Sequence, residues 1–168
     1  MKAILMHAAV AALLLVARAE AAPIVEVLFV DPPRYTDARL GGDVASELEA
    51  TLSELRAHLE ARGAKFLNDG DRLVIEVLDL DLAGSAELWR SRARDMRVLR
   101  DVTVPTMHLR YALTRGGVES TGEERISDLG YLQDRWRCRS GERLCHEKQM
   151  LDEWFGRRLI GDTAQRVQ

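Results

Sequence analysis

The sequence predicts an α+β domain. A mostly antiparallel sheet of about four strands, in the chain order β-α-β-β-β-α, is expected to carry two amphipathic helices. Apolar residues recur at helical spacing in residues 44–62 and 142–159, and β-branched or alternating runs bounded by Gly and Pro make up the rest. The 168 residues, 46% hydrophobic and 30% charged, suit one globular domain. The net charge of −3 disfavours a nucleic-acid partner, because the cationic excess that binds phosphate backbones is missing.

Residues 1–21 are predicted to be a secretory signal peptide. Lys2 precedes an apolar run over residues 8–16, and two Ala-x-Ala cleavage frames follow within residues 17–21. The run is about half of the roughly 20 apolar residues that a membrane span requires, so no stable membrane anchor is expected after cleavage. We therefore expect a mature chain that begins at Ala22, carries a net charge of −4 and is soluble in the periplasm or secreted.

The mature chain is expected to begin with a strand followed by a helix. Residues 23–30 are rich in β-branched side chains and end at a pair of prolines, which indicates a strand, and their nearly continuous apolar character suggests burial on both faces. A helix is expected over residues 44–62, with Asp43 as its N-cap and Gly63 just past its end. Its apolar stripe consists of Val44, Leu48, Leu52, Leu55 and Leu59.

A second strand is expected over residues 73–82. One of its faces begins apolar and turns polar at Asp79 and Asp81. The other face is expected to hold the even positions Val74, Leu78, Leu80 and Leu82.

The remaining elements are a third strand, a hairpin and a second helix. The third strand starts near residue 98 and is interrupted at Pro105, and its continuation over 107–113 pairs with residues 118–127 through a Gly-Gly turn. A helix is expected over residues 142–159, with Leu144, Lys148, Leu151 and Phe155 on its buried stripe. The single domain spans residues 22–160, and residues 161–168 form a flexible tail.

Asp79 and Asp81 are the first candidates for a functional site. Residues two apart on a strand point to the same side, so two carboxylates about 7 Å apart could share a divalent cation or an acid/base task. In the structural alternative, one carboxylate caps the exit of the strand near Gly84 while the other accepts hydrogen bonds from backbone or arginine. Spacing alone supplies no further ligand, and this favours the structural alternative.

Two arginine clusters, each beside a tryptophan, are further candidates. Five Arg lie within residues 90–100 next to Trp89, and four lie within residues 135–143 next to Trp136. Guanidinium groups bind phosphates and carboxylates, and aromatic rings stack on sugars, so an envelope glycan is a candidate ligand. A solvated loop whose arginines pair with neighbouring acids is the favoured alternative. Asp128 is expected to cap the short turn that follows it.

Cys138 and Cys145 are predicted to form a disulfide. An exported chain meets an oxidising compartment, where an even pair of cysteines favours a bridge. Closing so short a loop contributes roughly 2–3 kcal/mol in the chain-entropy model. A redox thiol at a helix start is one alternative, although a Cys-x-x-Cys motif is missing. A zinc site at His146 is another, but it would need more ligands, such as His108 or His58.

Four segments carry a resemblance to a known family. In order they read VLDLDLAG, LRY, GEERISDLGYL and EKQMLDEWF, and they occupy residues 77–84, 109–111, 122–132 and 147–155. Together they resemble an uncharacterised family of exported bacterial proteins, domain of unknown function 3016, over nearly the whole mature chain. The resemblance implies export and a single domain, and it supplies no catalytic residues.

These observations predict a non-catalytic exported protein that binds an envelope protein or glycan, without cofactor or metal. The candidate binding residues are Asp79, Asp81, Trp89 and Asp128. The chain contains no Gly-x-Ser-x-Gly, P-loop or His-Glu-x-x-His pattern. The alternative is a small periplasmic hydrolase or metal-dependent enzyme that uses Asp79 and Asp81, helped by Asp128 or His108. A third hypothesis, an oligomeric structural protein, predicts an exposed apolar patch.

Overall fold

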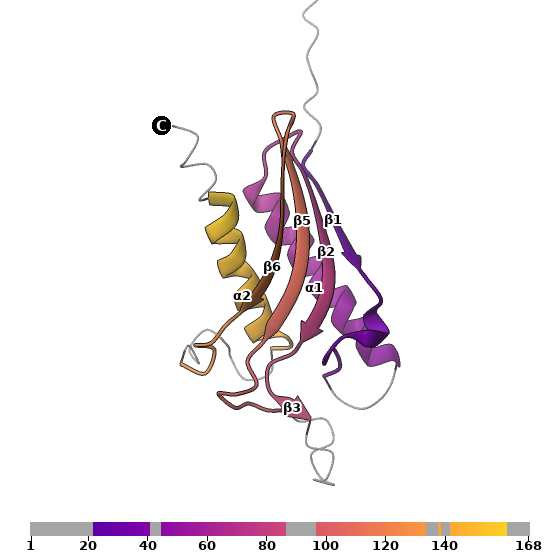
Figure 1. The fold of residues 1–168 in the computed structure, drawn as a ribbon, viewed down its shortest axis with the longest axis vertical. Helices are drawn as coiled ribbons and strands as arrows, with labels where there is room; N and C mark the ends of the chain where they lie inside the picture. Colours follow the sequence, from indigo (N-terminus) through magenta and orange to yellow (C-terminus); the bar gives the residue numbers. More distant parts are fainter. Residues whose placement is uncertain (1–21, 41–44, 87–96, 134–137, 139–141, 161–168) are drawn as a thin grey trace, which may run out of the picture.

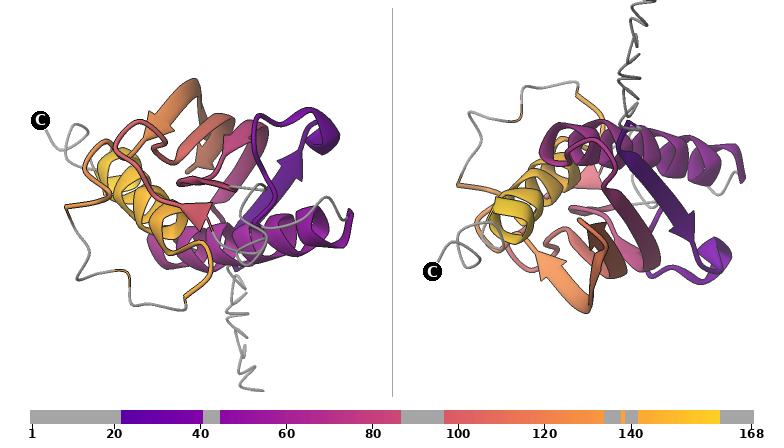
Figure 2. Two further views of the ribbon diagram at one scale, coloured as in Figure 1. Left: turned by 90° about the horizontal axis from the view of Figure 1, so that it is seen from below. Right: turned by 90° about the horizontal axis from the view of Figure 1, so that it is seen from above.

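The computed structural model describes residues 22–40, 45–86, 97–133, 138 and 142–160. Its principal elements are β1 (Ile24–Phe29), α1 (Ala45–Phe66), β2 (Arg72–Asp81), β5 (Thr106–Arg115), β6 (Val118–Ser127) and α2 (Cys145–Phe155). The four strands form one sheet in the order β1-β2-β5-β6, and both helices cover the same face of it (Figures 1 and 2). Since β1 is parallel to β2 and the other two pairings are antiparallel, the predicted fold class is confirmed.

β1 lies at an edge of the sheet, joined to β2 through α1. Because the helices cover only one face, the side chains of β1 alternate between the core and solvent. Val27 is 4% exposed, whereas Ile24 and Leu28 on the opposite face are 49% and 42% exposed. The predicted burial of this strand on both faces is therefore wrong, although its position is confirmed.

β2 contains a bulge that the alternation pattern did not reveal. Val77 pairs with Leu109 but Asp79 pairs with His108, so Leu78 is the extra residue. The bulge moves the core-facing positions from odd to even numbers, and the predicted grouping of the even positions on one face is wrong. The fully buried residues are Leu73, Ile75 and Val77 before the bulge and Leu80 and Leu82 after it.

α1 extends four residues beyond the expected end, so Gly63 lies inside it rather than past it. A Cβ atom at Gly63 would lie 2.8 Å from Cγ2 of Val25 on β1, so the glycine permits close approach of helix and strand. Leu55 and Leu59 are fully buried, as the apolar stripe predicts. Asp43 and Val44 lie outside the described residues.

The expected third strand is mostly loop. Only Arg97–Val98 is extended, as β4, and it pairs with β3 (Ser85–Ala86) apart from the main sheet. Thr103 ends the extended chain because its backbone N–H and its hydroxyl both donate to the Arg100 carbonyl, which closes a turn. β5 then begins directly after Pro105, which has no N–H to donate to a strand ladder.

α2 is shorter than predicted, and it packs its aromatic end on the sheet and on α1. It begins after Leu144, which adopts a left-handed conformation with φ 54°, and it continues into a π-helical turn, Gly156–Ile160. The Phe155 ring stacks on Phe66 of α1 at 5.9 Å, and the Trp154 ring meets the edge of Tyr111 on β5 at 5.7 Å. None of the described helices combines the length and apolar composition that crossing a membrane requires.

Candidate functional site

Three carboxylates meet at the end of β2, and we call Asp37, Asp79 and Asp81 the carboxylate end. After β1 the chain forms a short 3-10 turn, Pro32–Arg34, and returns alongside β2. Asp37 bridges Asp81 in parallel fashion: its N–H donates to the Leu80 carbonyl, and its own carbonyl accepts from the Leu82 N–H, both at 2.9 Å. The bulge in β2 is what places Asp79 and Asp81 away from the helix-covered face.

Asp79 is fully engaged by its neighbours. Its Oδ1 accepts hydrogen bonds from the backbone N–H groups of Thr36 (2.8 Å) and Leu80 (2.9 Å). Its Oδ2 accepts from the Thr36 hydroxyl at 2.8 Å and pairs with the Arg125 guanidinium at 3.3 Å. Burial alone would raise the pKa of Asp79, but these hydrogen bonds and the charge of Arg125 hold it below its ordinary value. The side chain therefore fastens the returning chain to the bulge.

Asp81 is in the opposite situation. Within the described part of the chain, its oxygens accept no hydrogen bond and form no ion pair shorter than 4 Å. Burial raises the pKa of Asp81, and the charges of Asp37 and Asp79 raise it further, against a smaller effect of Arg97 and Arg125. Of two aspartates that look equivalent in the sequence, one is thus bonded through both oxygens, and the other has no such partner among the described residues.

Arg97 organises the surroundings of the carboxylate end. Its side chain is 7% exposed, and its guanidinium pairs with Oδ2 of Asp37 at 2.8 Å. It also donates to four backbone carbonyls, those of Arg39, Leu82, Ala83 and Gly84, at 2.6–3.1 Å. The sequence predicts a solvated cluster around Arg97, because charge and spacing do not show that five acceptors converge on one guanidinium.

The other predicted site residues do not join this group. Asp128 caps its own turn, since its Oδ1 accepts from the Gly130 N–H at 2.9 Å, and the predicted capping role is confirmed. His108 pairs with Glu123 at 3.0 Å on the open face of the sheet. Trp89 and its arginines at 90, 92 and 94, together with Trp136, lie outside the described residues. Among the residues that are described, no group of three or more His, Cys, Asp or Glu side chains is arranged to hold a metal ion.

A second polar site, which sequence reasoning missed, lies between α1 and α2. The cleft encloses about 480 Å³ and is lined by His58, Arg62, Glu142, Cys145, Lys148, Gln149, Asp152 and Glu153. Oδ1 of Asp152 contacts Nε2 of His58 at 2.8 Å and Nε of Arg62 at 2.6 Å. The i,i+4 spacing of the two basic residues was the available signal. These contacts join α1 to α2 across the cleft, so it is a seam between the helices.

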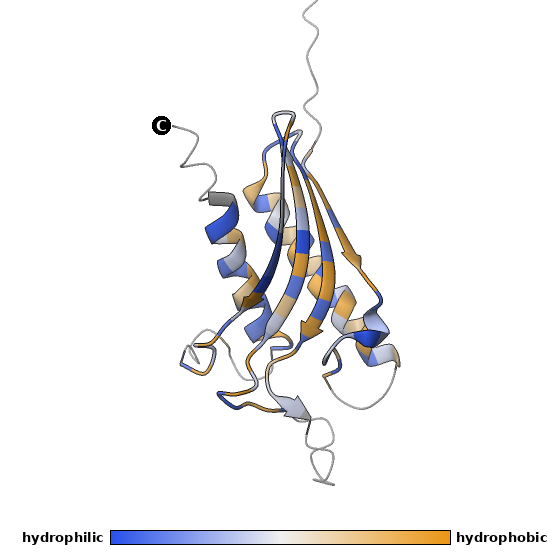
Figure 3. Ribbon diagram, viewed as in Figure 1, coloured by the Kyte–Doolittle hydropathy of each residue, from blue (hydrophilic) through white to orange (hydrophobic). Residues whose placement is uncertain are grey.

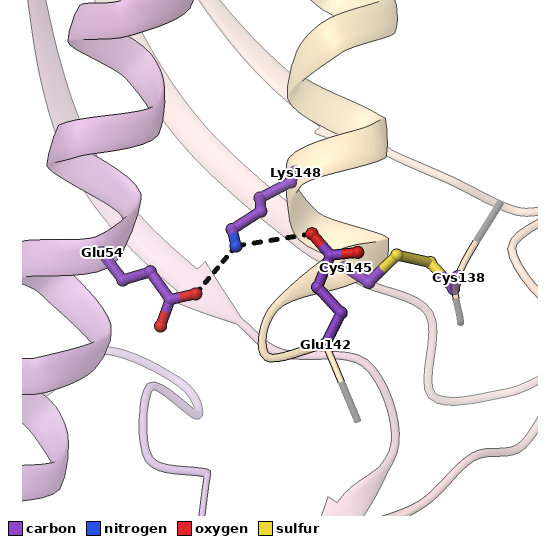
Figure 4. Close-up of a disulfide and its surroundings, with 5 residues drawn as sticks. All are labelled: Glu54, Cys138, Glu142, Cys145 and Lys148. Carbon is purple, nitrogen blue, oxygen red and sulfur yellow. Dashed lines mark ion pairs between the residues drawn. A yellow bond between two sulfur atoms is a disulfide. The ribbon is translucent and has the colours of Figure 1, made fainter. Parts of the chain in front are cut away.

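The predicted disulfide between Cys138 and Cys145 is confirmed, and it lies at one end of this seam (Figure 4). Lys148, one turn after Cys145, pairs with Glu54 of α1 at 2.8 Å and with Glu142 at 3.8 Å. Glu147 is 3% exposed, and its carboxylate accepts from the Ala83 N–H at 2.7 Å. The start of α2 is therefore tied to α1, to the loop before it and to the exit of β2.

These features define a class: a small α+β protein with a helix-covered sheet, a local disulfide and an acidic cluster where β2 ends. The chain belongs to the family described as Protein of unknown function (DUF3016), whose family model matches residues 23–157. No curated protein and no solved structure is similar enough to this chain to match.

Proposed function

We propose that the protein is exported, loses residues 1–21 and acts outside the cytoplasm as a non-catalytic binding protein of the cell envelope. The signal-peptide pattern supports export. The Cys138–Cys145 disulfide adds support, because such bridges persist in the periplasm and outside the cell. The family model matches residues 23–157, so the matched region lies entirely after the proposed leader.

The state of Asp81 carries the binding proposal. Its neighbours Asp37 and Asp79 already have cationic and hydrogen-bonding partners, whereas Asp81 has neither within the described residues. A partly buried carboxylate without such partners gains from a cation, because the pair offsets the cost of removing the charge from water. The partner is accordingly an envelope protein or glycan that presents an ammonium or guanidinium group to Asp81.

The alternative of a hydrolase or metal-dependent enzyme has less support. It requires Asp79 and Asp81 to act together, as acid and base or as metal ligands. Both oxygens of Asp79 already accept hydrogen bonds from Thr36 and Leu80, and Arg125 adds a charge pair. An Asp79 with these bonds holds the chain around Thr36 in place and has no oxygen left for a substrate or a metal.

Capture from an envelope extract by immobilised mature protein tests the proposal. Asp81→Asn keeps the shape of the side chain and removes its charge. We expect it to lower recovery of the specific partner by about tenfold, the loss of one charge-assisted hydrogen bond. Because the pKa of Asp81 is raised, the variant is expected to be at least as stable as the parent at pH 7, so unfolding cannot explain the loss.

Glu119→Gln is the matched control. It removes one negative charge at the opposite end of the sheet, where β6 begins beside the hairpin turn, and it should leave recovery unchanged. Equal recovery with the parent and with Asp81→Asn would contradict the proposal. Equal losses in Asp81→Asn and Glu119→Gln would assign the effect to net charge and would contradict it as well.

A further inference from the structure

The outer edge of β1 offers unpaired backbone groups. The N–H groups of Ile24 and Val30 donate to carbonyls of β2 and of the residue before it, at 3.0 and 2.9 Å, so the even positions of this strand face β2. In a parallel ladder the residues between them direct N–H and C=O to the other side. These residues are Val25, Val27 and Phe29, and the described part of the chain places no strand beside them.

The two edges of the sheet differ in how they are protected. β6, at the other edge, carries Glu119, Glu123, Glu124 and Arg125, and such charges discourage pairing with another chain. β1 carries only Glu26, which Arg72 of β2 holds in an ion pair at 2.6 Å. Figure 3 shows the contrast, with β1 apolar except at one position and β6 mostly hydrophilic. β1 is therefore the edge that is open to strand addition.

A groove between the end of β1, the turn after it and α1 gives the first part of the added strand a place for its side chains. It encloses about 610 Å³, and Phe29, Pro32, Pro33, Leu48 and Leu52 make much of its wall apolar. On the opposite face of β1, Ile24 and Val30 are 49% and 46% exposed. A strand paired with β1 would cover apolar surface on both of its own faces.

Two charges on α1 set the chemistry of the occupant. Glu49 and Arg56 both line the groove, and the Arg56 guanidinium lies 5.2 Å from the centre of the Phe29 ring. Neither forms an ion pair within the described residues. They are two helical turns apart, about 10 Å, a distance that long side chains four residues apart on one face of an extended strand can bridge.

We propose that the edge of β1 and this groove bind an extended segment of another protein, which adds to the sheet antiparallel to β1. The segment carries apolar side chains between a basic residue facing Glu49 and an acidic residue facing Arg56. α1 returns against the direction of β1, and Arg56 lies at Phe29, the last residue of the strand. Glu49 therefore lies past the end of β1, so the basic residue comes first in the segment and the residues after the acidic one pair with the strand. This surface is separate from the carboxylate end and does not depend on the proposed function.

A defined peptide tests the proposal on the mature protein. The probe is the blocked peptide Ser-Lys-Val-Val-Val-Glu-Val-Thr-Val-Ser, whose last four residues can reach back along β1 to Val25. Its charge-exchanged counterpart is Ser-Glu-Val-Val-Val-Lys-Val-Thr-Val-Ser. Amide hydrogen exchange is measured by NMR at Val25, Val27 and Phe29 with increasing peptide. We expect exchange at these amides to slow by about tenfold at saturation. The charge-exchanged peptide should bind about fivefold more weakly, because both of its charge pairs with α1 become repulsive.

The protein variant Glu49→Lys/Arg56→Glu reverses both groove charges and should invert the preference between the two peptides. If this variant still bound the first peptide as tightly as the parent protein does, the assignment of the two charges would be overturned. No added protection at the three amides with either peptide would overturn the proposal itself. Protection that rises with protein concentration in the absence of peptide would assign the edge to a second copy of this chain and would overturn it too.

Discussion

At the scale of single residues, Asp79 and Asp81 show that two aspartates only two residues apart can have opposite effects on stability. Hydrogen bonds from Thr36 and Leu80 and the charge of Arg125 favour the charged form of Asp79. Burial and two neighbouring carboxylates disfavour the charged form of Asp81. The first aspartate stabilises the fold at neutral pH, and the second reduces its stability.

This contrast predicts opposite pH dependences. A lowered pKa means that the stability from Asp79 is present above the ordinary carboxyl pKa and is lost as pH falls through the folded-state value. Asp79→Asn should lower the free energy of unfolding by about 1–3 kcal/mol at pH 7, with a smaller deficit near pH 3.

Asp81→Asn should behave in the reverse sense. A raised pKa means that folding stability falls as pH rises from the ordinary carboxyl pKa to the folded-state value, and the penalty persists above it. The free energy of unfolding of the variant should therefore exceed that of the parent at pH 7 and equal it at low pH. Urea unfolding of the mature proteins across this pH range measures both differences, and parallel curves for the two variants would contradict the assignment.

At the scale of elements, the packing of α1 on β1 depends on a glycine inside a helix. Gly→Ala at an interior helical position ordinarily stabilises by about 1 kcal/mol. At Gly63 the new Cβ would lie 2.8 Å from a methyl group of Val25, and a β-branched side chain has little freedom to move away. Overpacking of this kind costs about 1–3 kcal/mol, so packing outweighs helix propensity here.

We therefore expect Gly63→Ala to destabilise the protein by about 1 kcal/mol net. Val25→Ala removes the obstructing methyl groups, so the double variant Val25→Ala/Gly63→Ala should be more stable than the sum of the single effects allows. Denaturant midpoints of the parent, the two single variants and the double variant complete this double-mutant cycle. Additive effects, or a stabilising Gly63→Ala, would show that the contact between helix and strand is looser than the structure indicates.

Much of this architecture could be predicted from local patterns, and the failures have physical causes. The stripe that includes Leu55 and Leu59 identifies α1, because burial of a helix face leaves a periodic signal. The bulge at Leu78 leaves none, because an extra residue is recognised only by the strand that pairs with it. The same holds for Arg97, whose five acceptors come from two segments distant in sequence. The sequence identifies Asp79 and Asp81 as a pair, but only the tertiary contacts distinguish the two.

At the scale of the whole molecule, stability is shared among three contacts of different range. The apolar core joins both helices to the sheet, and the polar seam of His58, Arg62 and Asp152 joins α1 to α2 across 90 or more residues of chain. The disulfide, in contrast, closes a short loop, with a sequence separation of 7. It orders the start of α2 without holding distant parts of the chain together.

Reduction should consequently weaken the protein without unfolding it. In the chain-entropy model, a bridge of this separation contributes roughly 2–3 kcal/mol, a large part of the marginal stability of a small domain but less than the core provides. We expect Cys138→Ser/Cys145→Ser to lower the free energy of unfolding by this amount and to make stability insensitive to reductant, while the parent falls to the same level when reduced. Global unfolding of the parent on reduction would show instead that α2 depends on the bridge for its docking. The fold could then form only in an oxidising compartment, and the local character of the disulfide would not imply a local role.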